Sequence, residues 1–401
     1  MRYIVLILLT HLGFNLCAQH KCATMERTQQ RAAAEESYAK GLEANRQLAE
    51  SFEAGIYGAD RSIKQVDLAV VVHVLYREES DNISMEQIHS QIDVLNRDFN
   101  WEQNDKGLIP EIWRESGETS GFRFHLADKD PDGNFTTGVT RKQTTVSDIG
   151  GGEDYYRAEW GGIEPWPQPH YINIWVCEIG GNVLGFTYLP SVSAQPSDGI
   201  VMDPRAFGTT GTAVHPYNGG RTLVHEMGHY FGLRHLWGQE EGDCTNTDYM
   251  ADTPWQREAN FGCNDFPHVS CPSEPDGDMF MNFMDYADDE CGLLFTKNQI
   301  EFMQLVLQTA KVTLLHSPAI TGITEPDDLG LTIYPNPAEE KINALFDSRY
   351  KGKKFGVYNA LGQEVRTGWV SSSVESVDLS NLSKGVYFLK IDSDFVRIQK
   401  Q

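Results

Sequence analysis

The sequence predicts an α+β protein in which a mixed domain, with a twisted sheet and one histidine-rich helix, precedes a small all-β sandwich. A valine-rich run at 68–75 is typical of a strand that is covered on both faces. Histidines recur at helical spacing between 225 and 235. After residue 317 the chain changes to short alternating segments separated by turn signals.

Length and charge narrow the functional classes. The 401 residues are enough for two or three domains. The formal net charge of -24 argues against binding to nucleic acid phosphates, which requires a basic surface. An acidic surface suits a secreted protein with cationic substrates, although a merely well-solvated surface explains the charge equally well.

The first 18 residues are typical of a secretory signal peptide. A positive start at Arg2 precedes an apolar run from Ile4 to Ala18, which is too short to span a bilayer. Acylation of Cys17 as a lipoprotein is the weaker alternative, because the residues before it form a poor lipobox. No later stretch is apolar and long enough for a transmembrane segment, so the sequence predicts a soluble, exported protein.

Residues 19–60 are interpreted as a pro-segment. The stretch from Thr24 to Ala54 is rich in Ala, Glu, Gln and Arg and offers little core. The Gly-rich stretch at 55–62 that follows is expected to be exposed and cleavable.

Residues 61–318 are predicted to form the mixed domain. Ser84 and Thr296 each begin a helix, with Gln three residues later in a capping-box arrangement. A third helix is expected from Arg221 to Leu233. Strands are expected at 67–76, 122–126, 171–177 and 200–202.

The third helix carries a set of candidate metal ligands. His225 and His229 are four residues apart and therefore share one helix face. Gly232 can end the helix with φ > 0, so that His235 returns as a third ligand. Glu226 projects beside the metal. A chance helix with surface histidines is the alternative, and the added Gly and third His argue against it.

Three imidazoles and one open position describe a catalytic Zn²⁺ site. Zinc lowers the pKa of water at such a site to roughly 7. Glu226 would act as general base towards that water and then pass the proton to the leaving amine. The pattern therefore predicts a zinc-dependent hydrolase.

The full motif, H-E-x-x-H-x-x-G-x-x-H, resembles that of the metzincin metalloproteases. This resemblance implies a methionine turn under the metal, which Met284 fits, and a tyrosine that stabilises the oxyanion, which Tyr286 fits. The run N-F-M-D-Y-x-D-D-x-C at 282–291 is similar to the pappalysin family, whose members hydrolyse proteins.

The pappalysin resemblance implies further sites. Four cysteines follow the zinc helix, the last of them Cys291, and sequence alone allows three ways of pairing them in two disulfides. The family implies Cys244–Cys271 and Cys263–Cys291. It also implies a calcium site with Asp248 and Thr253 as side-chain ligands, and an acidic residue, Glu290, in a substrate pocket that prefers Arg or Lys at P1′.

Cys22 is a candidate latency residue. Our hypothesis is that its thiolate occupies the open zinc position, as a pro-segment cysteine does in the small microbial members of the family. An incidental thiol is the alternative. Because those relatives cut before Arg or Lys, the resemblance implies self-processing at Asp60–Arg61.

A linker at 319–330 leads to the predicted β-sandwich at 331–401. Three segments resemble elements of the type IX (Por) secretion sorting domain, which implies the type IX secretion machinery as a partner: 334–337, 359–362 and 382–388. A substrate- or carbohydrate-binding sandwich is the alternative, and no aromatic cluster supports it.

These observations predict a secreted or surface-attached zinc endopeptidase made as a latent zymogen. One alternative is an inactive metal-binding, adhesin-like secreted protein, which would need neither Glu226 nor Tyr286. Another is a zinc hydrolase with a downstream Glu ligand, and the position of His235 argues against it.

Overall fold

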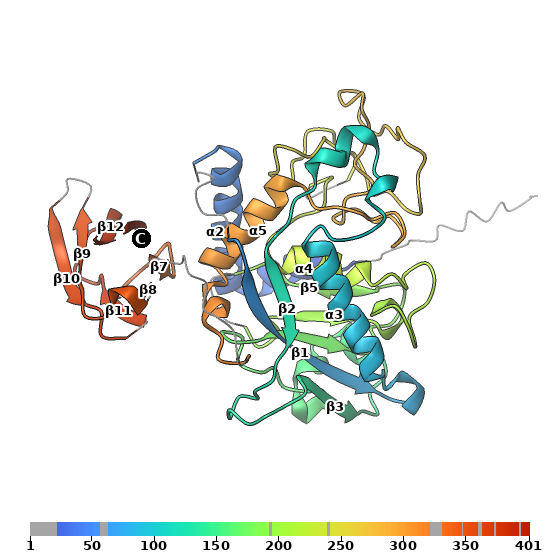
Figure 1. The fold of residues 1–401 in the computed structure, drawn as a ribbon, viewed down its shortest axis with the longest axis horizontal. Helices are drawn as coiled ribbons and strands as arrows, with labels where there is room; N and C mark the ends of the chain where they lie inside the picture. The colour runs from blue at the N-terminus through green and yellow to red at the C-terminus, as the bar shows by residue number, and fades with distance from the viewer. Residues whose placement is uncertain are drawn as a thin grey trace, which may run out of the picture.

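The computed structural model describes residues 22–56, 63–191, 195–238, 241–320, 331–346, 348–359, 363–372, 374–392 and 394–401. The predicted signal peptide, the Asp60–Arg61 bond and most of the predicted linker lie outside these residues. Figure 1 shows a larger α+β part and a smaller β module to one side of it. Within the described residues, no helix combines the length and apolarity that crossing a membrane would require.

The larger part is built on a mixed sheet with the order β2-β1-β4-β6-β5, and β3 also pairs with β1. Strand β1 (Val66–Tyr76) runs parallel to β2 (Phe122–Leu126), β3 (Val139–Gln143) and β4 (Ile172–Val176). Strand β6 (Ile200–Met202) continues the parallel order, and β5 (Gly185–Thr187) is an antiparallel edge strand. Residues 68–75 are buried on both faces, as their continuous apolar run predicts.

Three α-helices of the predicted mixed domain, α3, α4 and α5, accompany this sheet. Helix α3 (Met85–Phe99) begins where predicted, because the Ser84 hydroxyl accepts a hydrogen bond from the backbone N–H of Gln87. Helix α5 (Lys297–Thr309) has the complete predicted capping box between Thr296 and Gln299. Helix α4 (Arg221–Tyr230) ends three residues before the predicted end at 233.

Short 3-10 helices fill the connections between these elements. They are η1 (Glu79–Asp81), η2 (Lys106–Leu108), η3 (Glu111–Ser116), η4 (Ile149–Gly151), η5 (Asp154–Tyr156), η6 (Ala158–Trp160), η7 (Pro204–Ala206), η8 (Val312–His316) and η9 (Ser348–Tyr350).

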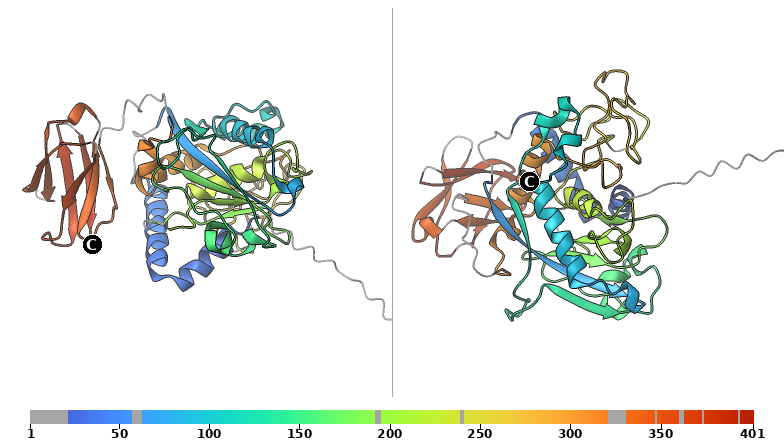
Figure 2. Two further views of the ribbon diagram at one scale, coloured as in Figure 1. Left: turned by 90° about the horizontal axis from the view of Figure 1, so that it is seen from below. Right: turned by 45° about the vertical axis from the view of Figure 1, so that its right-hand side comes forward.

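The predicted pro-segment forms two helices that cover the larger part (Figure 2). Helix α1 (Thr24–Ala34) lies against β5. Helix α2 (Glu36–Glu53) packs against the main core through Leu48, Ala49 and Phe52. The Phe52 ring lies 5.5 Å from the ring of Phe302 on α5. The segment therefore contributes more to packing than its composition suggested.

The chain between α4 and α5 has little regular structure and is held by two disulfides. Their pairing is Cys244–Cys271 and Cys263–Cys291, with Cα–Cα distances of 5.7 Å in both, which confirms the pairing that the family resemblance implied. Cys22 and Cys177 are buried free thiols.

The C-terminal module consists of two antiparallel sheets around their own apolar core, as predicted (Figure 2). One sheet has the order β10-β9-β12-β13 and the other β11-β8-β7. The strands are β7 (Leu331–Tyr334), β8 (Lys341–Phe346), β9 (Lys354–Asn359), β10 (Glu364–Trp369), β11 (Val374–Asp378), β12 (Gly385–Ile391) and β13 (Asp394–Lys400).

Candidate metal centre

Two glycines allow the close packing around α4. Gly232, with φ +93, turns the chain just beyond the helix end at Tyr230. At Gly228, a Cβ would lie 2.5 Å from the sulfur of Met284, so only glycine lets this side chain support the helix from below. Met284 is fully buried there, at the position predicted for the methionine turn.

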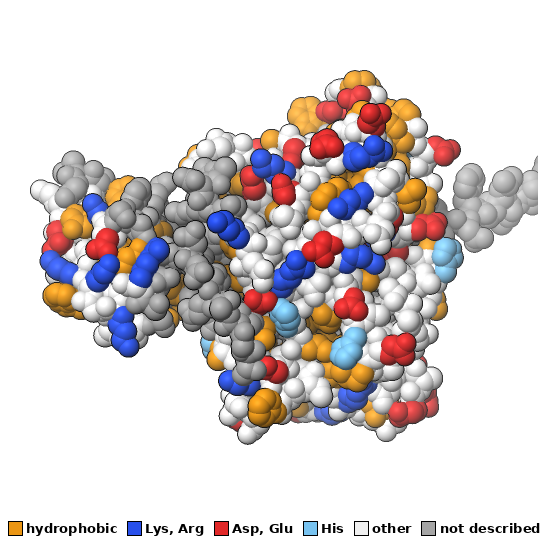
Figure 3. All heavy atoms as spheres, viewed as in Figure 1, with side chains coloured by type: hydrophobic (Ala, Val, Ile, Leu, Met, Phe, Trp, Pro, Cys, Tyr) orange, Lys and Arg blue, Asp and Glu red, His pale blue; other side chains and the backbone are white. Residues whose placement is uncertain are grey.

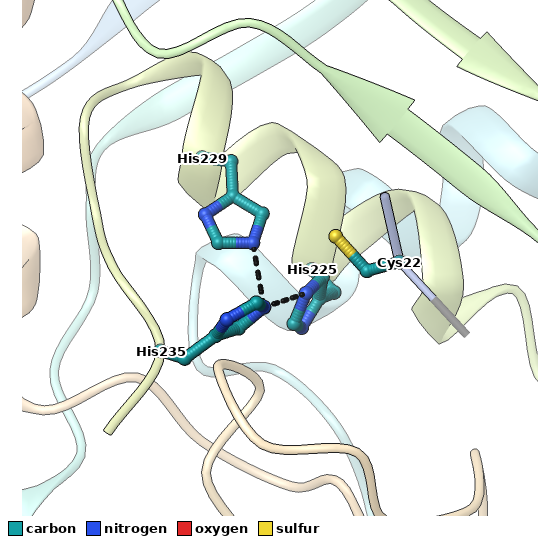
Figure 4. Close-up of side chains that lie close together, drawn as sticks. All are labelled: Cys22, His225, His229 and His235. Atoms are coloured by element: carbon teal, nitrogen blue, oxygen red, sulfur yellow. Dashed lines mark hydrogen bonds between the residues drawn. The ribbon is translucent and has the colours of Figure 1, made fainter. Parts of the chain in front are cut away.

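The three predicted histidines meet at one point (Figure 4). The Nε2 atom of His235 lies 3.1 Å from Nε2 of His229 and 3.3 Å from Nε2 of His225. Nδ1 of His225 is 2.6 Å from the carbonyl oxygen of Phe283, and Nδ1 of His229 is 2.8 Å from that of Leu233. Carbonyls are acceptors only, so Nδ1 carries the proton in both His225 and His229, and the Nε2 lone pair of each of these two rings faces the common point.

This arrangement suits zinc. Nitrogen ligands at about 2.0–2.1 Å in a tetrahedron lie roughly 3.3 Å apart, which is the spacing found here. Burial, and then the neighbouring histidines, hold the pKa of His229 and of His235 well below the ordinary value. Both imidazoles are therefore neutral, as metal ligands must be.

Glu226 lies beside the three histidines and is fully buried. Its Oε2 accepts a hydrogen bond of 2.8 Å from the hydroxyl of Thr24. Burial raises the pKa of Glu226 to about 7, although hydrogen bonds from Cys22 and Thr24 lower it. A carboxyl group in this setting can both accept and return a proton near neutral pH.

Tyr286 lies next to the histidines. Its ring lies 4.9 Å from the His235 ring and 5.0 Å from that of Trp237. Its hydroxyl donates to the carbonyl oxygen of Cys22 at 3.3 Å. The hydroxyl is thus directed at a peptide carbonyl located beside the three imidazoles.

Cys22 reaches the same point from the pro-segment (Figure 4). Its sulfur and the three histidine nitrogens all lie within 4.8 Å of one another. The backbone at Cys22 and Ala23 is fixed, because Cys22 pairs with Gly185 in a parallel bridge and the N–H of Ala23 donates to the Gly185 carbonyl at 3.2 Å. The sulfur therefore lies beside the three histidine nitrogens.

A pocket opens next to the centre between α4 and the chain that follows Met284. Asp288 and Asp289 are on its wall, and its lining also includes Tyr217, Arg221, Thr222, His225, Glu226, Tyr286 and Gly292. The Asp289 carboxylate accepts from the N–H groups of Gly219 and Arg221 at 2.8 and 3.2 Å. It therefore also fixes the start of α4.

The structure places Glu290 outside this pocket. Glu290 is exposed and absent from the pocket lining, and its carboxylate lies 3.6 Å from the sulfur of Cys263. The reason is a tight turn in which the N–H of Cys291 donates to the carbonyl of Asp288 at 2.8 Å. This turn directs Glu290 towards the Cys263–Cys291 disulfide and leaves Asp288 on the pocket wall.

The predicted calcium ligands also lie together. The Thr253 hydroxyl is 2.9 and 3.0 Å from the two carboxylate oxygens of Asp248 and 2.9 Å from the carbonyl of Met250. Asp248 is buried, and burial raises its pKa to about 7.

Sequence reasoning missed two residues that shape the centre. Thr24 gave no signal, because its partners Glu226 and Thr187 are distant in sequence. Arg221, at the start of α4, forms a buried ion pair with Asp98 at 3.0 Å and a second, partly exposed one with Asp105 at 2.6 Å. A basic residue at a helix start opposes the helix dipole, and this was a usable signal of a specific partner.

Family models match both parts of the chain. Residues 163–308 match the family described as "Pregnancy-associated plasma protein-A", a peptidase family, and residues 332–401 match the "Secretion system C-terminal sorting domain". The chain is 30% identical over 249 residues to an extracellular metalloprotease of Arthroderma gypseum, covering 61% of this chain and 73% of that protein.

The chain is also similar to solved metalloprotease structures. Mature mirolysin of Tannerella forsythia, in complex with a cleaved peptide, is 39% identical with a TM-score of 0.59, covering 62% of this chain and 95% of that one. A promirolysin mutant of the same organism is 34% identical with a TM-score of 0.65, covering 76% of this chain and all of that one (100%).

Proposed function

This chain belongs to the pappalysin family of metzincin metalloproteases, and on that premise we propose that it is a secreted zinc endopeptidase held latent by its own pro-segment. Its zinc ligands are His225, His229 and His235. The observation that carries the proposal is the convergence of their three Nε2 atoms beside the buried carboxyl group of Glu226.

The catalytic roles follow from what each side chain faces. Zinc, when bound, polarises the peptide carbonyl and makes water at the site more acidic. Glu226 takes a proton from that water and returns it to the leaving amine. Tyr286 donates its hydroxyl hydrogen to the carbonyl oxygen as negative charge develops there, as it donates to the Cys22 carbonyl in this structure.

The test uses the protein after removal of the pro-segment, by self-processing in the wild type and by added active enzyme in variants that cannot process themselves. We expect one zinc per molecule, casein cleavage that a chelator stops and added zinc restores, and loss of cleavage in Glu226→Ala with zinc retained. Glu290→Ala, which changes an exposed carboxylate outside the pocket, is the control and should cleave normally. A protein that binds zinc and folds but cleaves nothing would support the adhesin-like alternative.

We also propose that latency depends on two neighbouring contacts. The Cys22 sulfur fills the fourth position at the metal, and the Thr24 hydroxyl binds the carboxylate of the general base. The backbone N–H of Thr24 donates to the Cys22 sulfur at 3.3 Å, so the two contacts hold each other in place. The match to a promirolysin over 76% of this chain supports the zymogen interpretation.

Replacing each free thiol in turn tests this latency. Cys22→Ala should cleave casein before processing, whereas Cys177→Ala, which removes the other buried thiol, should remain latent. Thr24→Val, which keeps the shape but removes the hydroxyl, should shorten the lag before activity. A Cys22→Ala zymogen that stays inactive would contradict the role of the thiol.

A preference for Arg or Lys at P1′ is the third element of the proposal. Asp288 is half-buried on the wall of the pocket beside Tyr286, and a carboxylate there attracts a cationic side chain. In a peptide library, Asp288→Asn should lower the preference for basic over neutral P1′ residues about tenfold, and Glu290→Gln should leave it unchanged. Wild-type cleavage that ignores P1′ would refute this preference.

Calcium binding is proposed at Asp248 and Thr253. Their oxygens and the Met250 carbonyl lie together, and hard oxygen ligands of this kind suit Ca²⁺. A buried carboxylate with a raised pKa also favours a bound cation, because charge neutralisation removes the cost of ionising it.

The sorting domain match at 332–401 assigns the protein to a secretion system, and the resulting location is extracellular or on the cell surface. The proposed division of the chain is a signal peptide at 1–18, a pro-segment at 19–60, a catalytic domain at 61–318, a linker at 319–330 and a sorting domain at 331–401. Mass spectrometry of the protein recovered from culture medium should identify both processed ends.

A further inference from the structure

The pro-segment covers the outer edge of β5 by pairing with its backbone. The carbonyl of Gly185 accepts from Ala23, the N–H of Thr187 donates to the Thr24 hydroxyl at 2.9 Å, and the N–H of Leu189 donates to the Thr28 hydroxyl at 3.3 Å. An exposed strand edge offers these groups to an extended peptide. Helix α1 therefore lies on the path that a substrate would take along β5.

Two arginines of α1 bind to this same surface. The Arg27 guanidinium lies 3.8 Å above the centre of the Phe186 ring and donates to the Gly151 carbonyl at 2.9 Å. The Arg31 guanidinium lies 4.7 Å from the centre of the Tyr188 ring and donates to the Gln195 side chain at 3.0 Å.

Arg31 is held in a manner that requires a guanidinium group. It is 8% exposed, and it also donates to the hydroxyl of Ser197, which is completely buried. Burying an unpaired guanidinium is costly, so its N–H groups must meet acceptors that are already in place. Although it forms an ion pair with Glu35 of its own helix at 3.3 Å, its aromatic partner Tyr188 and its acceptors at 195 and 197 belong to the catalytic domain.

We propose that the surface formed by Phe186, Tyr188 and Ser197, here called the arginine site, also binds an Arg or Lys side chain of the substrate. This inference rests on the proposed function. None of the three residues lines the pocket that contains Asp288. The arginine site would thus select a residue on the other side of the scissile bond from P1′, along β5, and the enzyme would favour segments that are basic on both sides of the cleavage point.

Matched peptides test this inference. Each has a central bond with Arg at P1′, and a single Arg is moved through positions P2 to P6 and compared with citrulline, which keeps the shape but lacks the charge. Because the moved Arg is itself a possible P1′ residue, cleavage of the central bond is quantified separately by mass spectrometry of the products. With the processed enzyme, we expect kcat/KM to be about tenfold higher for Arg than for citrulline at one of these positions. Ratios below about twofold at every position would overturn the inference while leaving the proposed function intact.

Variants of the arginine site separate binding from general damage. Ser197→Ala and Tyr188→Leu should lower the Arg-to-citrulline ratio towards one, while kcat/KM for the citrulline peptide stays within about twofold of wild type. Should Tyr188→Leu fold poorly by circular dichroism, Ser197→Ala alone decides. An unchanged ratio in a folded Ser197→Ala would overturn the assignment of the site. Failure of every peptide to be cut would overturn the proposed function, and this inference with it.

Discussion

The catalytic domain and the C-terminal module both have apolar cores, yet they differ in what else they bury. The catalytic domain buries charged and imidazole groups deeply, among them His73, Asp98, Arg221, Glu226 and Asp285. In the module, the one charged side chain that is buried within its described residues is Lys400. Buried polar groups cost stability, so a domain keeps them where their chemistry is needed.

Charge separates the two parts in the same way. Residues 331–401 contain ten Lys and Arg against eight Asp and Glu, so the negative charge of the chain belongs to the rest. Figure 3 shows several Lys and Arg side chains on the visible face of the module. We therefore expect metal, pH and single buried charges to change the activity or stability of the catalytic domain, and to have little effect on the stability of the module.

Removing a metal ligand should give the largest difference between the two parts. His235→Ala leaves two imidazoles, so we expect zinc loss and a fall in casein cleavage of about a thousandfold or more. Lys353→Ala, an exposed change in the module, is the control and should retain both. Zinc content and cleavage are measured together. Full activity in His235→Ala would break the assignment of the third ligand.

Loss of Arg221 should destabilise the catalytic domain strongly. Arg221→Met removes the buried cation that contacts Asp98 and Asp105. The buried Asp98 carboxylate then keeps its pair with Arg97 but loses the one with Arg221, and breaking a buried pair in this way costs up to about 3–5 kcal/mol. Lys351→Met in the module removes an exposed charge and should cost less than about 0.5 kcal/mol. Urea unfolding followed by tryptophan fluorescence measures both, and equal effects would contradict the contrast.

We expect His73 to make the folded protein less stable at acidic pH. Burial lowers its pKa to about 4, although the hydrogen bond with Asn173 raises it, and the unfolded value is about 6.5. Between these values the unfolded chain binds a proton that the folded chain does not, so stability falls as pH falls. From pH 7 to pH 5 the wild type should lose about 2 kcal/mol more than His73→Gln. The same loss in both proteins would exclude His73 as its source.

Calcium should give the smallest effect. Because the pKa of Asp248 is raised, its ionisation costs stability as pH rises through about 7, and a bound cation would offset this cost. We expect millimolar Ca²⁺ at pH 8 to stabilise the catalytic domain by about 1 kcal/mol, or 2–4 °C in Tm. Asp248→Asn should remove the shift, and Asp130→Asn, in an exposed turn, should retain it. A calcium shift that survives in Asp248→Asn would place the site elsewhere.

The sequence predicted those features that depend on neighbours in the chain. The strand at β1, the capping box at Thr296 and the turn at Gly232 are all set by residues a few positions apart. Helices α1 and α2 lack side-chain caps at Ala23 and Glu35, which removed the usual signals for their start.

Tertiary contacts account for the remaining differences. Thr24 meets Glu226 from 202 residues away, and no local pattern could pair them. The position of Glu290 outside the pocket has a different origin, because a tight turn decides which of three consecutive acidic residues faces the pocket. Family resemblance supplied the correct disulfides, since cysteine pairing depends on the fold and not on spacing.

The threonine contacts of α1 have a consequence for the protein before it is secreted. A bare sheet edge can recruit a strand from another molecule and so begin aggregation. While α1 is in place, its hydroxyls occupy the N–H groups of Thr187 and Leu189, and no foreign strand can add there. The segment proposed to hold the enzyme latent thereby also closes this edge to strands of other molecules.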